Sequence, residues 1–234
     1  DLSKIEAGRM ELELADKVVL ITGASGGLGR ELALAYGRQQ ACVAVHYHKN
    51  EGAAEVVAQS VEALGGEALT FNADLADRSS IEAMINEIKS EWGGVDILIN
   101  SPSAFEGNVP LETLGVAQWD RMLDVMLTGV FHTISLCVPH MRAHKWGRIV
   151  TITSTSVKEP IDGLTISNAM RPAVVGYLKT LSRRVAADGI LVNVVCPGAF
   201  LTQRHRDLLP KWAAELGCTP EEFLQVATNP TVRP

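Results

Sequence analysis

The chain has 234 residues, of which 47% are hydrophobic and 5% aromatic, and its formal net charge is −6. A chain of this length can bury one sizeable core, and an α/β domain is ordinary at this size. The charge is spread without blocks, which makes nucleic acid and anionic membranes poor partners.

The four cysteines have neither the spacing of a metal site nor the pairing of a disulfide framework. No signal peptide is recognisable, and no apolar run approaches the roughly 18 residues of a membrane-spanning helix. We therefore expect a cytoplasmic protein without a bound metal. Residues 1–9 precede Met10, a natural starting residue, and we interpret them as an extension of no assigned function. Residues 10–234 are interpreted as one domain.

The first predicted strand, Val18–Thr22, ends in the most informative part of the sequence, a glycine-rich turn. Its glycines have the spacing Gly-x-x-x-Gly-x-Gly. Glycine allows positive φ and lets a diphosphate approach the backbone, and the following helix offers unpaired N–H groups at the positive end of its dipole. The alternative is a strand-to-helix turn with a purely structural role. The pattern predicts a nucleotide site made by Gly23, Ser25, Gly27, Leu28 and Gly29.

Strand and helix patterns alternate through the following part of the chain. Further apolar runs predict buried strands at Cys42–His46, Ala68–Phe71, Val95–Asn100, Arg148–Thr153 and Leu191–Cys196. Helical patterns lie between them, at Asn50–Leu64, Ile81–Trp92, Trp119–His144 with a bend near Pro139, and Asn168–Ala187. This alternation predicts an α/β fold with a doubly wound, Rossmann-like parallel sheet and helices on both faces.

Residues 202–229 carry two short helical patterns, and the second begins with a capping box at Thr219–Glu222. In a doubly wound sheet, ligands bind beyond the carboxyl ends of the strands. A helical flap after the last strand is therefore a candidate substrate lid. The alternative is an exposed hairpin that merely packs on the domain. The apolar side chains available to this flap are Trp212, Leu216, Phe223, Leu224 and Val226.

Five landmarks in the same order resemble those of the short-chain dehydrogenase/reductase family, over essentially residues 14–234. TGASGGLG at Thr22–Gly29 is similar to the family's cofactor turn. The pair Asp74-Leu75 is similar to the one that holds the adenine ring. VDILIN, which ends at Asn100, resembles the strand before the Asn-Asn-Ala-Gly motif of the family.

The last two landmarks lie in the second half of the chain. GRIVTITS ends in Ser154, at the position of the family's catalytic serine. LVNVVCPG resembles the stretch that meets the nicotinamide, which places Pro197, Gly198 and Thr202 at that end of the cofactor. The resemblance implies an oxidoreductase that moves hydride between a nicotinamide cofactor and a small-molecule carbonyl or secondary alcohol.

The end of the second strand indicates the choice of cofactor. An acid at this point binds the ribose hydroxyls of NAD, whereas basic and small polar residues accommodate the extra phosphate of NADP. Here Tyr47 is followed by His48, Lys49 and Asn50, with no acid before Glu51. Lys49 supplies a charge and Asn50 a donor, which favours NADP(H) over NAD(H). The alternative is that Lys49 is simply a solvated turn residue.

The catalytic motif of the family is altered in this chain. The family places a tyrosine thirteen residues after its serine and a lysine four residues later. Counting from Ser154 gives Ser167 and Arg171, and no Tyr-x-x-x-Lys occurs anywhere in the sequence. Tyr177 lies nearly three helical turns past the expected position. A further family residue, an asparagine in the long helix, aligns with Met126, and Ser101-Pro102-Ser103 departs from the loop motif.

These replacements change the chemistry that the site can perform. The hydroxyl of Ser167 is less acidic and shorter than a phenol, and Arg171 keeps a cation for ribose but cannot give up its proton. Met126 removes a polar anchor for a relay water. A water bonded by Ser154, Ser167 and Arg171 could act instead. We expect either a working but altered enzyme or a catalytically silent nucleotide-binding scaffold or sensor.

Members of the family usually continue for one more helix and a final strand. We interpret this chain as lacking that last strand, which leaves the sixth strand at an unpaired edge of the sheet. The two long helices at Trp119–His144 and Asn168–Ala187 still offer the family's other subunit contact. The resemblance therefore implies a homodimer or homotetramer through these helices.

Overall fold

A computed structural model describes residues 12–101, 111–198, 200, 202–215 and 217–228. The chain divides into two compact units, Asp1–Gly198 and Ala199–Pro234, which are considered separately. The first unit contains the sheet, and the second contains two helices.

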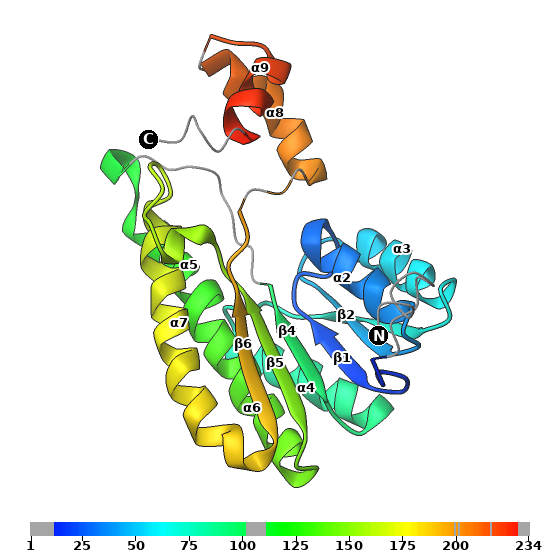
Figure 1. Cartoon of the computed structure of the whole chain (residues 1–234). Helices are drawn as coiled ribbons and strands as arrows, with labels where there is room; N and C mark the ends of the chain where they lie inside the picture. The colour runs from blue at the N-terminus through cyan, green and yellow to red at the C-terminus, as the bar shows by residue number, and fades with distance from the viewer. Residues whose placement is uncertain (1–11, 102–110, 199, 201, 216, 229–234) are drawn as a thin grey trace, which may run out of the picture. The chain divides into compact units, whose positions relative to one another are not determined.

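The first unit is built on a six-stranded sheet in the order β3-β2-β1-β4-β5-β6, in which every pairing is parallel (Figure 1). The order reverses between β1 and β4, as in a doubly wound fold. The predicted α/β fold is therefore confirmed. The strands are β1 Val18–Ile21, β2 Cys42–Tyr47, β3 Glu67–Asn72, β4 Ile97–Asn100, β5 Gly147–Ile152 and β6 Ile190–Val195.

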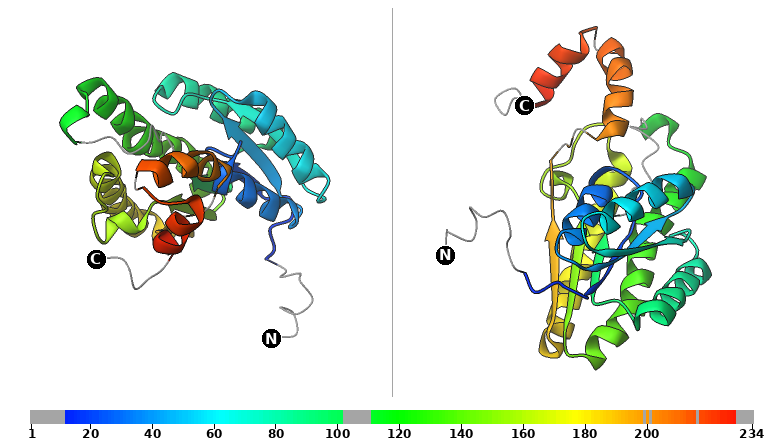
Figure 2. Two further views of the ribbon diagram at one scale, coloured as in Figure 1. Left: turned by 90° about the horizontal axis from the view of Figure 1, so that it is seen from above. Right: turned by 90° about the vertical axis from the view of Figure 1, so that its right-hand side faces the viewer.

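Each face of the sheet has its own apolar core, because alternate side chains of a strand point to opposite faces. On β1, Val18 and Leu20 belong to one core, whereas Val19 and Ile21 belong to the other. The core with Val19 and Ile21 includes residues of α2, Gly27–Gly37, and α3, Glu51–Glu62. Figure 2 shows these two helices on the same face of the sheet. The opposite core includes residues of α4 Arg78–Trp92, α6 Gly129–Ala143 and α7 Thr165–Val185.

The first long helix differs from the prediction at its start and in its middle. It begins at Val116 rather than Trp119, and it consists of α5 Val116–Leu123, a π-helical segment η2 Asp124–Thr128, and α6. Helix α6 continues through Pro139 to Ala143, so the irregularity lies at η2. A Cβ on Gly129 would collide with the carbonyl oxygen of Leu75, and this close approach requires glycine where the π-helical segment ends.

This helix is long and apolar enough to span a membrane by length and composition alone. Half of its most apolar window is buried inside the protein, where α6 packs in the core beneath the sheet. Burial of this helix against the sheet accounts for its apolar composition. The second long helix, α7, begins three residues before the predicted Asn168, and a 3₁₀ turn at Ala186–Asp188 follows its end.

Strand β6 is the edge of the sheet among the residues that the structure describes, and it pairs with β5 alone. Leu191 and Val195 of this strand are 52% and 46% exposed. Helix α7 covers one face of β6. These two residues alternate with the buried Ile190 and the half-buried Val192 and Val194, so the other face of the edge strand is open to solvent within the described part of the chain.

The second unit contains α8 Gln203–Glu215 and α9 Pro220–Thr228, which pack on each other. The predicted capping box is present: the amide of Glu222 donates to Thr219 Oγ1 at 3.2 Å, and the amide of Thr219 donates to Glu222 Oε2 at 2.8 Å. The side chains of Trp212, Leu216 and Val226 lie outside the described residues. The role of residues 202–229 as a lid stays a prediction.

Candidate active site

The glycine turn after β1 has the geometry that its spacing predicts. Gly23 adopts a φ of 70°, and a Cβ there would lie 2.9 Å from the carbonyl oxygen of Ser101. A Cβ on Gly29 would collide with the carbonyl oxygen of Gly23. Helix α2 begins at Gly27, and no side chain caps it among the described residues. Its first N–H groups therefore remain available to an anion, which fits the diphosphate of a dinucleotide.

His46 on β2 holds this turn, a role that the sequence did not indicate. The amide of Gly23 donates to His46 Nδ1 at 2.9 Å, and the amide of Ala24 donates to the carbonyl oxygen of His46 at 3.0 Å. His46 Nε2 donates to the carbonyl oxygen of Ala73 at 3.0 Å. The residue is 2% exposed, and burial lowers the pKa of its imidazole to about 4. The ring is therefore neutral near pH 7.

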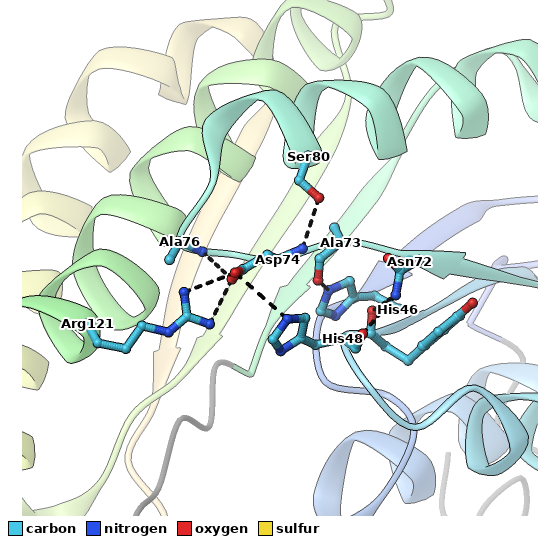
Figure 3. Close-up of polar contacts among 9 residues, drawn as sticks. His46, His48, Asn72, Ala73, Asp74, Ala76, Ser80 and Arg121 are labelled. Atoms are coloured by element: carbon cyan, nitrogen blue, oxygen red, sulfur yellow. Dashed lines mark hydrogen bonds and ion pairs between the residues drawn. The ribbon is translucent and has the colours of Figure 1, made fainter. Parts of the chain in front are cut away.

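Asp74, predicted to hold the adenine ring, lies in a network of polar contacts just after β3 (Figure 3). Arg121 of α5 donates to both carboxylate oxygens at 2.9 and 3.0 Å, and the amide of Ala76 donates at 2.9 Å. His48 Nε2 lies 3.7 Å from the carboxylate. Burial opposes ionisation, but the hydrogen bonds from Arg121 and Ala76 outweigh it and hold the pKa of Asp74 below its usual value.

The neighbouring predicted residues are placed as follows. Leu75 is buried directly after Asp74. At the end of β2, the hydroxyl of Tyr47 donates to Glu51 Oε1 at 2.8 Å, and Lys49 is exposed. Asn50 Oδ1 accepts from the amide of Ala53 at 3.2 Å and caps α3, so the side-chain NH₂ of Asn50 is the group left to donate toward a ligand.

Two unsatisfied polar atoms lie at the ends of the central strands. Asn100 is 1% exposed, and its Oδ1 accepts from Thr133 Oγ1 at 3.0 Å. Asn100 Nδ2 and Thr151 Oγ1 are buried and find no partner among the described residues. The two residues are paired in the register of β4 and β5. Buried polar atoms of this kind are costly unless a water or ligand satisfies them.

Ser154 follows β5 and begins a 3₁₀ turn at Thr155–Val157. Its Oγ accepts from the amide of Ser156 at 3.2 Å, which leaves the hydroxyl hydrogen of Ser154 free to donate. The amide of Thr155 donates to the carbonyl oxygen of Pro197 at 3.0 Å. This backbone bond brings the Pro197–Gly198 stretch beside the turn that Ser154 begins. Thr202 belongs to the second unit, where its carbonyl oxygen accepts from the amide of Arg206.

Ser167 and Arg171, near the start of α7, are joined to this serine through Ser156. Arg171 Nε donates to Ser167 Oγ at 2.8 Å, and the hydroxyls of Ser167 and Ser156 lie 3.4 Å apart. Arg171 Nη1 also donates to the carbonyl oxygen of Ile152 at 3.2 Å. Burial lowers the pKa of Arg171, but a guanidinium titrates so far above neutrality that it keeps its charge. The structure thus brings the three predicted catalytic residues into one network.

Neither Met126 nor Tyr177 supplies the polar group that the family has in its catalytic site. Met126 is buried with Met122 and Met170 in an apolar cluster between η2 and α7. Tyr177 packs edge-on against Phe131, with ring centroids 5.7 Å apart. It is a ring on the α6–α7 surface, and burial raises its pKa. Pro102 and Ser103 of the altered loop lie outside the described residues.

Comparison with known proteins identifies the family. The description of short chain dehydrogenases matches residues 17–212. The 3-oxoacyl-(acyl-carrier-protein) reductase FabG of Staphylococcus epidermidis is 34% identical over 187 residues, which cover 80% of this chain and 76% of that protein. The chain therefore belongs to the short-chain dehydrogenase family and is an oxidoreductase of that type.

Solved structures agree with this assignment. L-sorbose reductase from Gluconobacter frateurii, complexed with NADPH and L-sorbose, has a TM-score of 0.86 at 25% identity, and the match covers 92% of this chain and 82% of that one. The NADH-dependent reductase A1-R′, complexed with NAD, has a TM-score of 0.77 at 23% identity and covers 81% of each chain. The latter likeness shows the fold, and the two cofactors differ.

Proposed function

We propose that this protein is an NADP(H)-dependent oxidoreductase that acts on a carbonyl or secondary alcohol through an altered proton-donor site. The observation that carries the proposal is the network of Ser154, Ser156, Ser167 and Arg171 at the carboxyl end of the sheet. A bound nicotinamide supplies or accepts the hydride. The residues of the chain orient the substrate oxygen, hold the ribose and move the proton.

Ser154 is suited to polarise a carbonyl group. The amide of Ser156 donates to Ser154 Oγ, so the hydroxyl hydrogen of Ser154 is left to donate to another acceptor. A substrate oxygen is such an acceptor. A donor that is oriented before the substrate arrives stabilises the negative charge that develops on that oxygen in reduction.

Ser167 receives a hydrogen bond from Arg171, and its own hydrogen is therefore available to Ser156 or to a water. We propose that Ser167 positions a water as the proton route, while the remaining N–H groups of Arg171 bind ribose hydroxyls. The methionine cluster around Met126 excludes a polar relay through η2. The proton route then runs on the serine side of the site.

The proposed preference for NADP(H) rests on the charge at the end of β2. Lys49 is exposed there, and the helix cap uses only Oδ1 of Asn50, which leaves its NH₂ group to donate. A phosphate dianion gains charge-assisted hydrogen bonds in such surroundings. L-sorbose reductase, similar in fold and 25% identical, was solved with NADPH.

We further propose a cytoplasmic homodimer or homotetramer formed through α5–α6 and α7, with residues 202–229 as a substrate lid. The outer surface of these helices supports the contact. Phe131 of α6 is 47% exposed and packs on Tyr177 of α7, which places two aromatic rings at the surface. Exposed aromatic clusters are favoured in subunit interfaces.

A second candidate function is a nucleotide-binding scaffold or sensor without turnover. The replacement of the family's tyrosine and lysine by Ser167 and Arg171, together with the apolar cluster at Met126, favours it. In that case the nucleotide half of the site would bind its ligand as well as in an enzyme, and no substrate would oxidise it.

One experiment separates the two functions. The purified protein is titrated with NADPH by fluorescence and then offered a panel of ketones, quinones and 3-oxoacyl thioesters. We expect saturable binding and substrate-dependent oxidation that is lost in Ser154→Ala and kept in Ser90→Ala, an exposed control on α4. Binding without oxidation across the panel would reject the enzyme in favour of the scaffold.

A further inference from the structure

We propose that His46 is a positioning residue of the nucleotide site, whose imidazole ties the glycine turn to the segment that receives the adenine ring. The inference rests on the proposed nucleotide function. It adds to that site a residue that acts through Gly23 and Ala73. The His46 ring accepts a hydrogen bond from the Gly23 amide and donates one to the Ala73 carbonyl at the same time, and the side chain is buried.

The two contacts reach two different connections of the fold. Strand β2 lies between β1 and β3 in the sheet. The Gly23 amide, from the connection after β1, donates to Nδ1 at 2.9 Å. The Ala73 carbonyl, directly after β3, accepts from Nε2 at 3.0 Å, and Figure 3 shows the ring beside that carbonyl. Ala73 immediately precedes Asp74 and Leu75, so one ring sets the separation between turn and adenine segment.

The Gly23 amide needs a side-chain acceptor. With a φ of 70° the residue has left the strand, and its N–H lies outside the parallel ladder that ends at Ile21. A buried N–H without an acceptor is costly. The acceptor must be a lone pair on Nδ1, which places the imidazole hydrogen on Nε2, where the Ala73 carbonyl accepts it. In the other tautomer, with the hydrogen on Nδ1, both hydrogen bonds are lost.

The same geometry excludes a charged ring. A protonated imidazole has two N–H donors, and one of them would face the N–H of Gly23. The charged or titratable groups that act on the ring are His48 after β2 and Asp74 after β3. These two groups have opposite signs when both are charged. The carboxylate of Asp74 is already bound by Arg121. His46 is thus a neutral spacer beneath a charged cluster.

Two amide variants separate the contacts. The Oδ1 of an asparagine occupies about the position of Nδ1, so His46→Asn keeps an acceptor for Gly23. The longer His46→Gln places its amide near the position of Nε2, so it keeps a donor for Ala73 and loses the acceptor for Gly23. We expect His46→Asn, which keeps the Gly23 bond and loses the Ala73 bond, to bind NADPH about three-fold more weakly than the wild type. We expect His46→Gln to bind about ten-fold more weakly, since a hydrogen bond at the phosphate turn is lost.

The measurements are the dissociation constant for NADPH by fluorescence, amide exchange at Gly23, and the ¹⁵N shifts of the His46 ring without ligand. His144→Asn, on the surface at the end of α6, is the matched control and should leave the dissociation constant unchanged. We expect the Nε2–H tautomer and faster Gly23 exchange in His46→Gln than in His46→Asn.

Each outcome has a distinct meaning. Equal dissociation constants for the asparagine and glutamine variants, or an Nδ1–H tautomer in the wild type, would overturn the role of His46. A wild-type protein that shows the Nε2–H tautomer but does not bind NADPH would overturn the proposed function instead. The tautomer and the Gly23 exchange rate test the positioning geometry in the protein without cofactor.

Discussion

The carboxyl edge of the sheet carries two polar regions that are built on different plans. The region after β1, β2 and β3 is closed by its own contacts: His46 binds Gly23 and Ala73, and Arg121 binds Asp74. The region after β4 and β5 keeps unused capacity. There, Asn100 and Thr151 each have a buried polar atom without a partner in the described structure.

This difference suits the first region to cofactor binding and the second region to the reaction. Paired side chains such as His46 and Asp74 do not need to be reordered when a ligand arrives, so this part of the nucleotide region is preorganised. The first N–H groups of α2 stay open to an anion. Atoms that still need a partner favour the entry of water or a substrate. Arg171 belongs to the second region, and within the described residues it donates to a serine hydroxyl and a backbone carbonyl rather than to a carboxylate. The chemical region therefore retains a cation whose charge is free to act on a ligand.

The largest effect is expected from Ser154→Ala. If the two regions are independent, turnover falls by about 10²–10³-fold, because an oriented donor to the substrate oxygen is lost. The dissociation constant for NADPH stays the same. Steady-state kinetics and fluorescence titration on one preparation check both. A parallel loss of cofactor affinity would show that the regions are coupled.

Acid should weaken the nucleotide region through His46. Its folded pKa of about 4 lies below the unfolded value of 6.5, so the unfolded chain binds the proton first. The stabilisation by neutral His46 is complete above pH 6.5 and is lost as pH falls toward 4, at most about 3 kcal/mol. Urea unfolding between pH 7 and 4 measures it.

The variant His46→Asn cannot titrate, and its free energy of unfolding should fall less steeply over the same pH range. Asp74 also loses stabilisation in acid, but below its usual pKa, because its folded pKa is lowered. Identical pH profiles for the wild type and His46→Asn would contradict the assignment of the loss to His46.

A smaller gain is expected from restoring the family's acid. Ser167→Tyr combined with Arg171→Lys should raise reduction of simple ketones about ten-fold. This is less than the full effect of a general acid, because the methionine cluster around Met126 still blocks a relay. Initial rates with NADPH test the double variant against each single one. No gain would indicate a pocket rebuilt around another substrate.

The smallest effect should follow from Lys49→Asp at the end of β2. A carboxylate there repels the extra phosphate and can bind ribose hydroxyls, which should shift the ratio of NADPH to NADH affinity by about ten-fold or less. The exposure of Lys49 limits the change. Glu55→Ala, at an exposed position on α3, is the control. An unchanged ratio would reject the phosphate role of Lys49.

Much of the fold could be predicted from local patterns. Each strand matches an apolar run to within about two residues, since a strand buried on both faces is apolar along its length. The turn at Gly23 and Gly29 was also predictable, because close backbone approach leaves only glycine as an option. The π-helical segment η2 was not, since no periodicity in the sequence records it; the close approach of Gly129 to Leu75 beside it joins residues far apart in sequence.

The residues that complete the site were missed for the same reason. His46 is 23 residues from Gly23, and Arg121 is 47 residues from Asp74. Crossover connections decide which of these side chains meet, and no periodicity records that. A polar residue at the end of the apolar run Cys42–His46 marked this position as unusual, but it did not identify the glycine turn as its partner. Ser156, which joins Ser154 to Ser167, gave none.

The cluster of Met122, Met126 and Met170 has a consequence for handling and for redox stress. Met170 lies on the helix that carries Arg171, and Met122 and Met126 pack against it; each of the three thioethers can take up an oxygen atom from peroxide to become a sulfoxide. The first sulfoxide would introduce a strong acceptor into a dry interior and loosen the packing between η2 and α7. Preparations kept under reducing conditions should hold their activity longest, and methionine sulfoxide reductases could repair what is lost.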